Sequence, residues 1–280
     1  MNLPKLPIGA WIEAVEKWMD TNMEPFFNLI TLIIRGMVNG LETILRYPPA
    51  LIIIIIFTLL AWLIGRWGLS AFTAIGLLLI ENLGYWDQTM QTLALVLTAA
   101  LISIVIGVPL GILSARSDRM QRIITPLLDF MQTMPAFVYL LPAITFFSLG
   151  VVPGVISSII FAIPPTIRLT NLGIRQVPSE LVEAADAFGS TPAQKLFKLQ
   201  LPLALPTIMA GINQTIMLSL SMVVIASMVG AQGVGATVYR AVTQVKTGIG
   251  FEAGLAIVIL AIILDRFTQR AIRRSNNVAS

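Results

Sequence analysis

The chain has 280 residues, of which 56% are hydrophobic and only 11% are charged. Soluble domains carry about 25% charged residues, so this chain lacks the polar side chains needed to cover a water-exposed globule. We therefore expect one integral membrane domain with several helical spans. The net charge of +4 is expected to mark one side of the membrane, and we expect no nucleic-acid partner.

Cysteine and histidine are both absent from the sequence. Their absence removes thiol nucleophiles, disulfides, the usual zinc ligands and the imidazole general base. We therefore expect no catalytic residue, no metal site and no cofactor in this chain. The first thirty residues also lack a basic leader followed by an apolar run, so no cleavable signal peptide is expected.

Residues 1–47 are amphipathic. Apolar side chains recur at helical spacing opposite a charged face, and they are Trp11, Ile12, Val15, Trp18 and Met19. A polar stripe then crosses the apolar stretch Phe26–Leu45. Such helices lie in the bilayer interface with one face in water, and we expect an extracytoplasmic interfacial segment here. A buried span whose polar groups face a bundle is the alternative.

Residues 48–270 are predicted to form an all-α, polytopic transmembrane domain of about seven spans, since about 20 apolar residues cross a bilayer. The expected spans are Tyr47–Gly65, Trp67–Trp86, Thr89–Ala115, two within Ile123–Ile167 that separate near Gly150 and Pro153, Leu205–Val229 and Thr247–Leu264. The glycine-rich stretch 230–235 is predicted to be a loop or re-entrant turn.

Lysine and arginine are unevenly distributed between the two sides of this arrangement. Twelve of the 18 basic residues fall on one side, and the other six are Lys5, Lys17, Arg35, Arg46, Arg240 and Lys246. The positive-inside rule makes the richer side cytoplasmic. The N-terminus is then expected outside, and the C-terminus inside, with residues 271–280 as a basic cytoplasmic tail.

The cytoplasmic stretch 168–204 is long and polar. Pro178 is predicted to begin a short helix that Gly189 ends, and a second helix is predicted to begin at Ser190–Pro192 and to end at Pro202. Several apolar residues are expected to be exposed on this hairpin, namely Leu181, Val182, Ala185, Phe188 and Leu196. A solvated connector is the simpler interpretation, but exposed apolar side chains favour a surface that docks a partner.

The motif Glu183-Ala184-Ala185-Asp186-Ala187-Phe188-Gly189, followed by Lys195-Leu196-Phe197 and Leu201-Pro202, resembles the EAA loop of ABC importer permeases. The stretches 131–142, 161–168, 210–217 and 222–230 resemble the glycine betaine/proline betaine subfamily of these permeases. The similarity covers about residues 48–270.

The resemblance implies a type I ABC importer permease in the bacterial cytoplasmic membrane. It implies import of glycine betaine, proline betaine, carnitine or choline during osmotic stress. The implied partners are two ATPase subunits, a second copy of this chain and an extracytoplasmic substrate-binding protein. The sequence has no Gly-x-x-x-x-Gly-Lys-[Ser/Thr] motif, so ATP and Mg²⁺ are expected in the partner ATPase.

The resemblance also makes the EAA segment a coupling helix that is seated in a groove of the ATPase. The implied coupling residues are Glu183, Ala184, Ala185, Asp186, Gly189, Lys195, Leu201 and Pro202. Glycine at 189 permits a tight turn that a Cβ would obstruct.

Candidate residues of the translocation path are polar or proline residues inside apolar stretches, and they are Asp129, Gln132, Pro135, Pro142, Asn213, Gln214 and Ser219. Each has a structural alternative. Thr125-Pro126 is predicted to begin a helix, which would put Asp129 in its first turn near the cytosol. Prolines are common in membrane helices, and amide and hydroxyl groups bond between helices. No compact aromatic cluster predicts a cage for a quaternary ammonium.

Three other functions compete with this interpretation. The first is an ABC permease for another small solute, such as an amino acid. The second is an autonomous ion-coupled carrier or channel. The third is an intramembrane enzyme, which the lack of Cys, His and any paired carboxylates at membrane depth disfavours.

Overall fold

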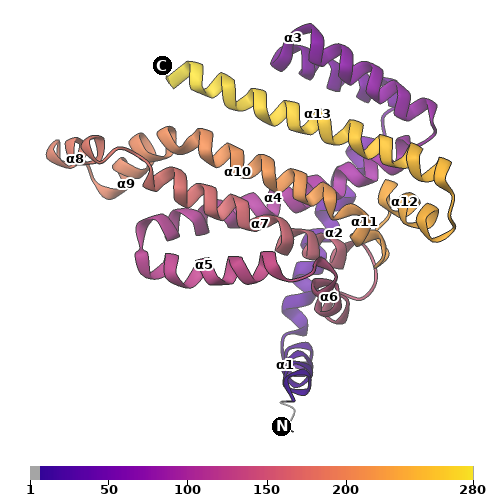
Figure 1. Cartoon of the computed structure of the whole chain (residues 1–280), viewed down its shortest axis with the longest axis horizontal. Helices are drawn as coiled ribbons and strands as arrows, with labels where there is room; N and C mark the ends of the chain where they lie inside the picture. The colour runs from indigo at the N-terminus through magenta and orange to yellow at the C-terminus, as the bar shows by residue number, and fades with distance from the viewer. Residues whose placement is uncertain (1–6, 280) are drawn as a thin grey trace, which may run out of the picture.

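The computed structural model describes the backbone of residues 7–279 and the side chains of residues 7–270, and no strand occurs between residues 7 and 279 (Figure 1). The helices are α1 (Ile8–Asn22), α2 (Glu24–Arg46), α3 (Ala50–Asn82), α4 (Trp86–Arg116), α5 (Asp118–Thr133), η1 (Ala136–Tyr139), α6 (Leu140–Phe147), α7 (Val151–Arg175), α8 (Ser179–Ala187), α9 (Pro192–Lys195), η2 (Leu196–Gln200), α10 (Leu201–Ser221), α11 (Val223–Ser227), α12 (Val234–Thr243) and α13 (Thr247–Ala279).

Six helical stretches are long and apolar enough to cross a membrane, and they are α2, α3, α4, α7, the run Pro192–Ser227 and α13. A seventh candidate is α5 with η1 and α6, which meet at a bend of 106°. The prediction of an all-α bundle with about seven spans is therefore confirmed. The predicted break near Gly150 also exists, because α6 ends at Phe147 and α7 begins at Val151.

Helix α3 folds back on itself at Arg66, whose φ of 58° lies in the left-handed region. The Ser70 hydroxyl donates a hydrogen bond to the Thr58 carbonyl oxygen at 3.1 Å. Twelve residues of straight helix would separate these groups by about 18 Å. The two arms on either side of Arg66 therefore lie side by side and correspond to the predicted spans Tyr47–Gly65 and Trp67–Trp86.

Helix α7 packs between α4 and α10 in the middle of the bundle (Figure 1). A Cβ added at Gly111 of α4 would lie 2.5 Å from the Cβ of Thr170, so only glycine allows this approach. The buried Thr166 and Thr215 hydroxyls are 2.7 Å apart and join α7 to α10. Small residues and hydroxyl pairs are the usual means by which membrane helices associate, because lipid gives them no hydrophobic drive.

Pro202 does not end a helix, so this prediction is wrong. The chain is helical from Pro192 through α9, η2 and α10, and η2 is a π-helical turn immediately before the proline. Proline lacks an N–H group and its ring collides with the carbonyl four residues earlier. The wider π turn accommodates this carbonyl, so the helix continues.

One predicted boundary in the α5 region is also wrong, namely the start of a helix at Thr125-Pro126. Helix α5 begins at Asp118, where the Ser117 hydroxyl accepts from the Met120 amide, and Pro126 lies inside it. A further bend, which was not among the predicted span boundaries, falls at Pro135 just before η1. Ser117 is the better N-cap, because its side chain accepts a hydrogen bond from a free first-turn N–H.

The long helices α7, α10 and α13 run roughly parallel, which separates the molecule into two ends (Figure 1). Helices α8 and α9 lie at one end, and α12 lies at the other (Figure 1). Helix α2 runs steeply across the bundle, and α1 continues from it and projects beyond the bundle (Figure 1).

Candidate functional site

The predicted coupling helix is α8, and its end is built by local signals. Pro178 precedes it, and Gly189 follows it with a φ of +74°. The Ser190 amide donates to the Ala185 carbonyl at 3.0 Å, which closes the glycine-ended cap common at helix C-termini. Thr191 and Gln194 then form a reciprocal capping box that begins α9. The chain therefore turns sharply between two helices with both ends capped.

An ion pair joins α8 to α9 across this turn. The Lys195 ammonium donates to both carboxylate oxygens of Asp186, at 2.7 and 2.8 Å. Both residues were predicted on the coupling surface, and their contact holds the two helices in one relative position. A rigid hairpin is what a mechanical connection between two subunits requires.

If the hairpin is the coupling element that the resemblance implies, replacing Lys195 with methionine is expected to lower coupled transport several-fold and to leave the amount of assembled protein unchanged. Methionine keeps an apolar stem of similar length but removes the charge that holds Asp186. Exposed ion pairs contribute at most about 1 kcal/mol, which sets the scale of the effect. Uptake per assembled complex measures it, Lys195→Arg is the matched control, and uptake unchanged in Lys195→Met contradicts the role.

Large apolar side chains are exposed on the hairpin and directly after it. Phe188 is 91% exposed and Phe197 is 66% exposed, and Leu181 is also exposed. Glu183 and Ala184 of the motif are exposed as well, and Ala185 is half-buried. Leu196 was predicted to be exposed, but it is buried against Ile174, Ala204 and Ile208, because α9 continues into α10.

The last two predicted coupling residues lie at the start of α10, below the hairpin. Leu201 is half-buried and Pro202 is exposed. The non-helical connection is also shorter than the predicted stretch 168–204, because α7 continues to Arg175. Arg175 donates to Asp118 at 2.7 Å and to the Ser114 carbonyl at 3.0 Å, so it ties the end of α7 to the α4–α5 turn.

Asp129 of α5 forms an ion pair with Arg168 of α7, with 2.5 Å between the carboxylate oxygen and the guanidinium nitrogen. The placement of Asp129 in a first turn is wrong, since α5 begins 11 residues earlier, about 16 Å along the axis. The two side chains are 58% and 41% exposed on the isolated chain. Gln132 follows on α5, Pro135 lies at the bend and Pro142 lies on α6 beyond it, and all three are exposed.

The remaining candidates lie on α10 and do not join that group. The Asn213 amide donates to Asp265 at 2.9 Å and accepts from the Thr268 hydroxyl, so it bonds α10 to α13. Ser219 is completely buried, and its hydroxyl has no partner within the described chain. Gln214 is exposed. Asn213 therefore forms the hydrogen bonds between helices that were the alternative to a role in the translocation path.

Sequence reasoning missed Arg168 as the partner of Asp129 and counted it as a loop cation. A signal was present, because Arg168 follows an apolar run that is long enough to continue a helix. It also missed α12 and the polar residues around it. Within residues 7–270, no group of three or more acidic side chains is arranged to hold a metal ion.

Comparison with known proteins assigns the chain to a family. Residues 107–276 match the family described as binding-protein-dependent transport system inner membrane component. The chain belongs to this family of ABC transport permeases. It is therefore a multi-pass protein of the cytoplasmic membrane that works with an ATPase and a substrate-binding protein and carries no ATPase of its own.

Several relatives are similar along nearly the whole chain. The glycine betaine permease OpuAB of Bacillus subtilis is 60% identical over 267 residues, 95% of each chain. The glycine betaine/carnitine permease GbuB of Listeria monocytogenes is 57% identical over 272 residues, 96% of each. The glycine betaine/proline betaine permease ProW of Escherichia coli is 52% identical over 97% of this chain and 77% of its own.

The fold also matches a solved structure. The inward-facing MetNI methionine ABC transporter superposes with a TM-score of 0.63 at 22% identity, over 70% of this chain and 97% of the transporter chain. At this identity the likeness concerns the fold alone. It confirms the predicted type I importer architecture.

Proposed function

We propose that this permease imports glycine betaine and related quaternary ammonium solutes and so protects the cell from osmotic stress. The observation that carries the proposal is the identity of 60, 57 and 52% to three permeases whose names all include glycine betaine. The chain covers nearly all of two of them, so the likeness includes the parts that would form a substrate passage.

The α8–α9 hairpin transmits the ATPase cycle to the bundle. Phe188, Phe197 and Leu181 offer an apolar surface for the groove of an ATPase subunit, and the Asp186–Lys195 ion pair keeps the hairpin rigid. Two permeases and two ATPase subunits would form the complex, with ATP and Mg²⁺ bound by the ATPases. Rocking of the two permeases would then open the passage alternately to each side.

The hairpin end of the bundle faces the cytosol in this proposal. Arginine and lysine residues gather at that end, in the α4–α5 turn, in α9 and at the end of α13. The positive-inside rule requires such an excess on the cytoplasmic side. Residues 1–47 then lie at the outer interface. The crosswise direction of α2 supports this placement (Figure 1), as do the exposed Trp11 and Trp18 of α1.

The Asp129–Arg168 pair lines the passage. Charged groups at membrane depth avoid lipid and face a water-filled cavity or another polypeptide. On the isolated chain both side chains are partly exposed, beside the exposed Gln132. A second copy packed against this face would enclose them in a polar passage between the two permeases.

Reconstitution tests the proposed function. The permease, its ATPase and its binding protein are co-purified and incorporated into liposomes, and uptake of labelled glycine betaine is measured with ATP. Uptake that needs all three proteins and ATP supports the proposal. Competition by an amino acid but not by glycine betaine would favour another solute, and uptake by the permease alone without ATP would favour an ion-coupled carrier.

A further inference from the structure

A cavity of about 320 Å³ opens at the end of the bundle opposite the coupling hairpin. The α3–α4 turn, α12 and the beginning of α13 surround it. Its polar lining comes mainly from Tyr85, Gln88, Arg240, Gln244 and Lys246. Two of these side chains are cationic and none is a carboxylate, so the lining suits a negatively charged group.

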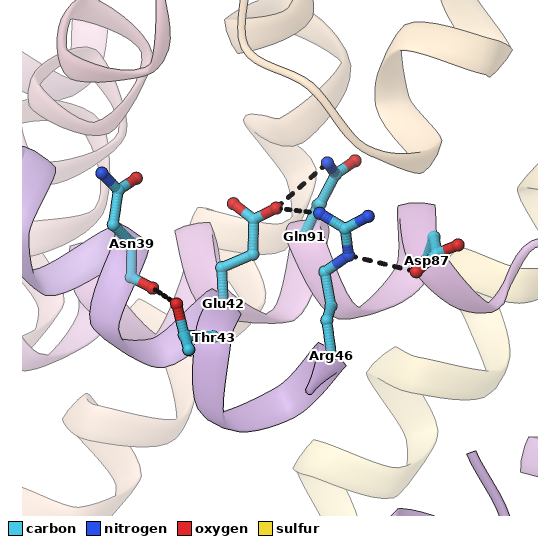
Figure 2. Close-up of polar contacts among 6 residues, drawn as sticks. All are labelled: Asn39, Glu42, Thr43, Arg46, Asp87 and Gln91. Carbon is cyan, nitrogen blue, oxygen red and sulfur yellow. Dashed lines mark hydrogen bonds and ion pairs between the residues drawn. The ribbon is translucent and has the colours of Figure 1, made fainter. Parts of the chain in front are cut away.

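The other cation near this end of the bundle is already neutralised. Arg46, at the end of α2, lies between Glu42 and Asp87, with its Nε 3.1 Å from the Asp87 carboxylate (Figure 2). Gln91 of α4 donates to the same Glu42 at 3.2 Å (Figure 2). This cluster fastens α2 to α4 and leaves Arg46 no unmet charge.

Arg240 and Lys246 differ from Arg46 because neither forms an ion pair with any side chain among residues 7–270. Arg240 only donates to the Ala236 carbonyl of its own helix, at 3.2 Å. The carboxylate of Glu252 is held by the Tyr85 hydroxyl at 3.2 Å. Burial and this hydrogen bond raise the pKa of Tyr85, so Tyr85 remains a donor at neutral pH.

The turn beside the cavity presents apolar side chains. Val245 has a φ of 56°, and the Lys246 amide donates to the Ala241 carbonyl at 2.8 Å, which closes the cap of α12. Glycine is usual at this position, and a β-branched residue there is strained. Val245 is nevertheless 85% exposed, and Val242 is 70% exposed. Exposed apolar side chains rimmed by polar residues mark interaction sites, and arginine is enriched at protein interfaces.

We infer that this cavity receives a carboxylate side chain of the extracytoplasmic substrate-binding protein when that protein docks. Arg240 binds the carboxylate through its planar guanidinium, Lys246 adds a second charge, and Val242 and Val245 pack against the docked surface. The inference rests on the proposed function for its partner and its orientation. Glycine betaine suits the cavity less well, because two cations attract its carboxylate but repel its quaternary ammonium, and Tyr85 is the one aromatic ring that residues 7–270 contribute to the lining, too little for an ammonium cage.

Charge reversal in the reconstituted complex tests the inference. ATP-driven glycine betaine uptake is measured while the concentration of purified substrate-binding protein is varied. Arg240→Glu with Lys246→Glu is expected to raise the half-saturating concentration of binding protein about tenfold or more, which corresponds to about 1.4 kcal/mol. The uptake rate at saturating binding protein is expected to stay close to that of the unaltered complex.

Two controls keep the result specific. Arg240→Lys with Lys246→Arg retains the charges and is expected to change the half-saturating concentration little, and Arg35→Glu reverses an exposed charge on α2, outside the cavity. An unchanged half-saturating concentration in the double reversal overturns the inference. So does an effect that appears only in vesicles containing phosphatidylglycerol and is absent from pure phosphatidylcholine, because the site would then bind a lipid phosphate. Failure of the unaltered complex to import betaine instead refutes the proposed function.

Discussion

Replacing Gly189 with valine is expected to abolish ATP-coupled uptake, and the altered chain is expected to insert and assemble normally. Gly189 has a φ of +74°, a conformation that costs other L-residues about 1–2 kcal/mol. The cost is greatest for a β-branched residue. The hairpin would relax to another backbone path and move Phe188 away from the ATPase. Uptake of labelled glycine betaine per assembled complex measures the loss.

Substitution by asparagine separates backbone strain from crowding at the same position. Asparagine tolerates the left-handed conformation better than other residues with a Cβ. A Cβ added at Gly189 meets no neighbouring atom of this chain within 4 Å, so the need for glycine comes from the positive φ of the turn and not from crowding within the chain. Gly189→Asn should therefore retain most uptake. Equal loss in both variants would mean that a partner surface crowds the position, and normal uptake by Gly189→Val would contradict a coupling role.

The sequence predicted the hairpin well because its signals are local. Pro178, Gly189 and Thr191 each act within one helical turn of their own position, through a fixed φ, a left-handed cap and a side-chain cap. The same holds for the break between the arms of α3. There a charged residue, Arg66, interrupts an apolar stretch too long for one span, and the backbone reverses at that residue.

The errors arose where distant parts of the chain decide the structure. Pro202 is a helix breaker by local rules, but a π turn before it and the burial of Leu196 against α7 and α10 keep the helix continuous. The α5 boundary failed for a related reason, because Pro126 is tolerated inside a helix that starts earlier at the Ser117 cap. The positions of the prolines in the sequence reveal neither the packing of Leu196 nor the competing cap at Ser117.

The Asp129–Arg168 pair shows the same limit at the level of function. Thirty-nine residues separate the two partners in sequence, and they meet only because α5 and α7 pack side by side. Asp129 could be recognised in the sequence as an acid inside an apolar stretch. Its distance from the end of the helix, however, depended on where α5 begins. With α5 beginning at Asp118, the charge lies about three turns into the helix. The structural alternative of a first-turn acid near the cytosol therefore loses its basis.

Replacing Asp129 with asparagine is expected to lower glycine betaine uptake about tenfold or more. The change leaves the Arg168 guanidinium without its partner, and a tenfold loss corresponds to only about 1.4 kcal/mol. Exchanging the two residues, as Asp129→Arg with Arg168→Asp, restores the ion pair and is expected to recover part of the uptake. Initial uptake rates at saturating binding protein measure both.

The choice of substrate distinguishes a passage residue from a purely structural one. Glycine betaine carries a carboxylate and a quaternary ammonium, whereas choline carries only the ammonium. If the pair lines the passage, Arg168→Gln with Asp129→Asn removes the group that attracts the carboxylate, and uptake of betaine falls more than that of choline. A structural role instead lowers the yield of assembled complex and reduces both rates by the same factor. Normal rates for both solutes in this double variant would remove the pair from the passage, because a lost charge in a narrow polar channel must alter the passage of a charged solute.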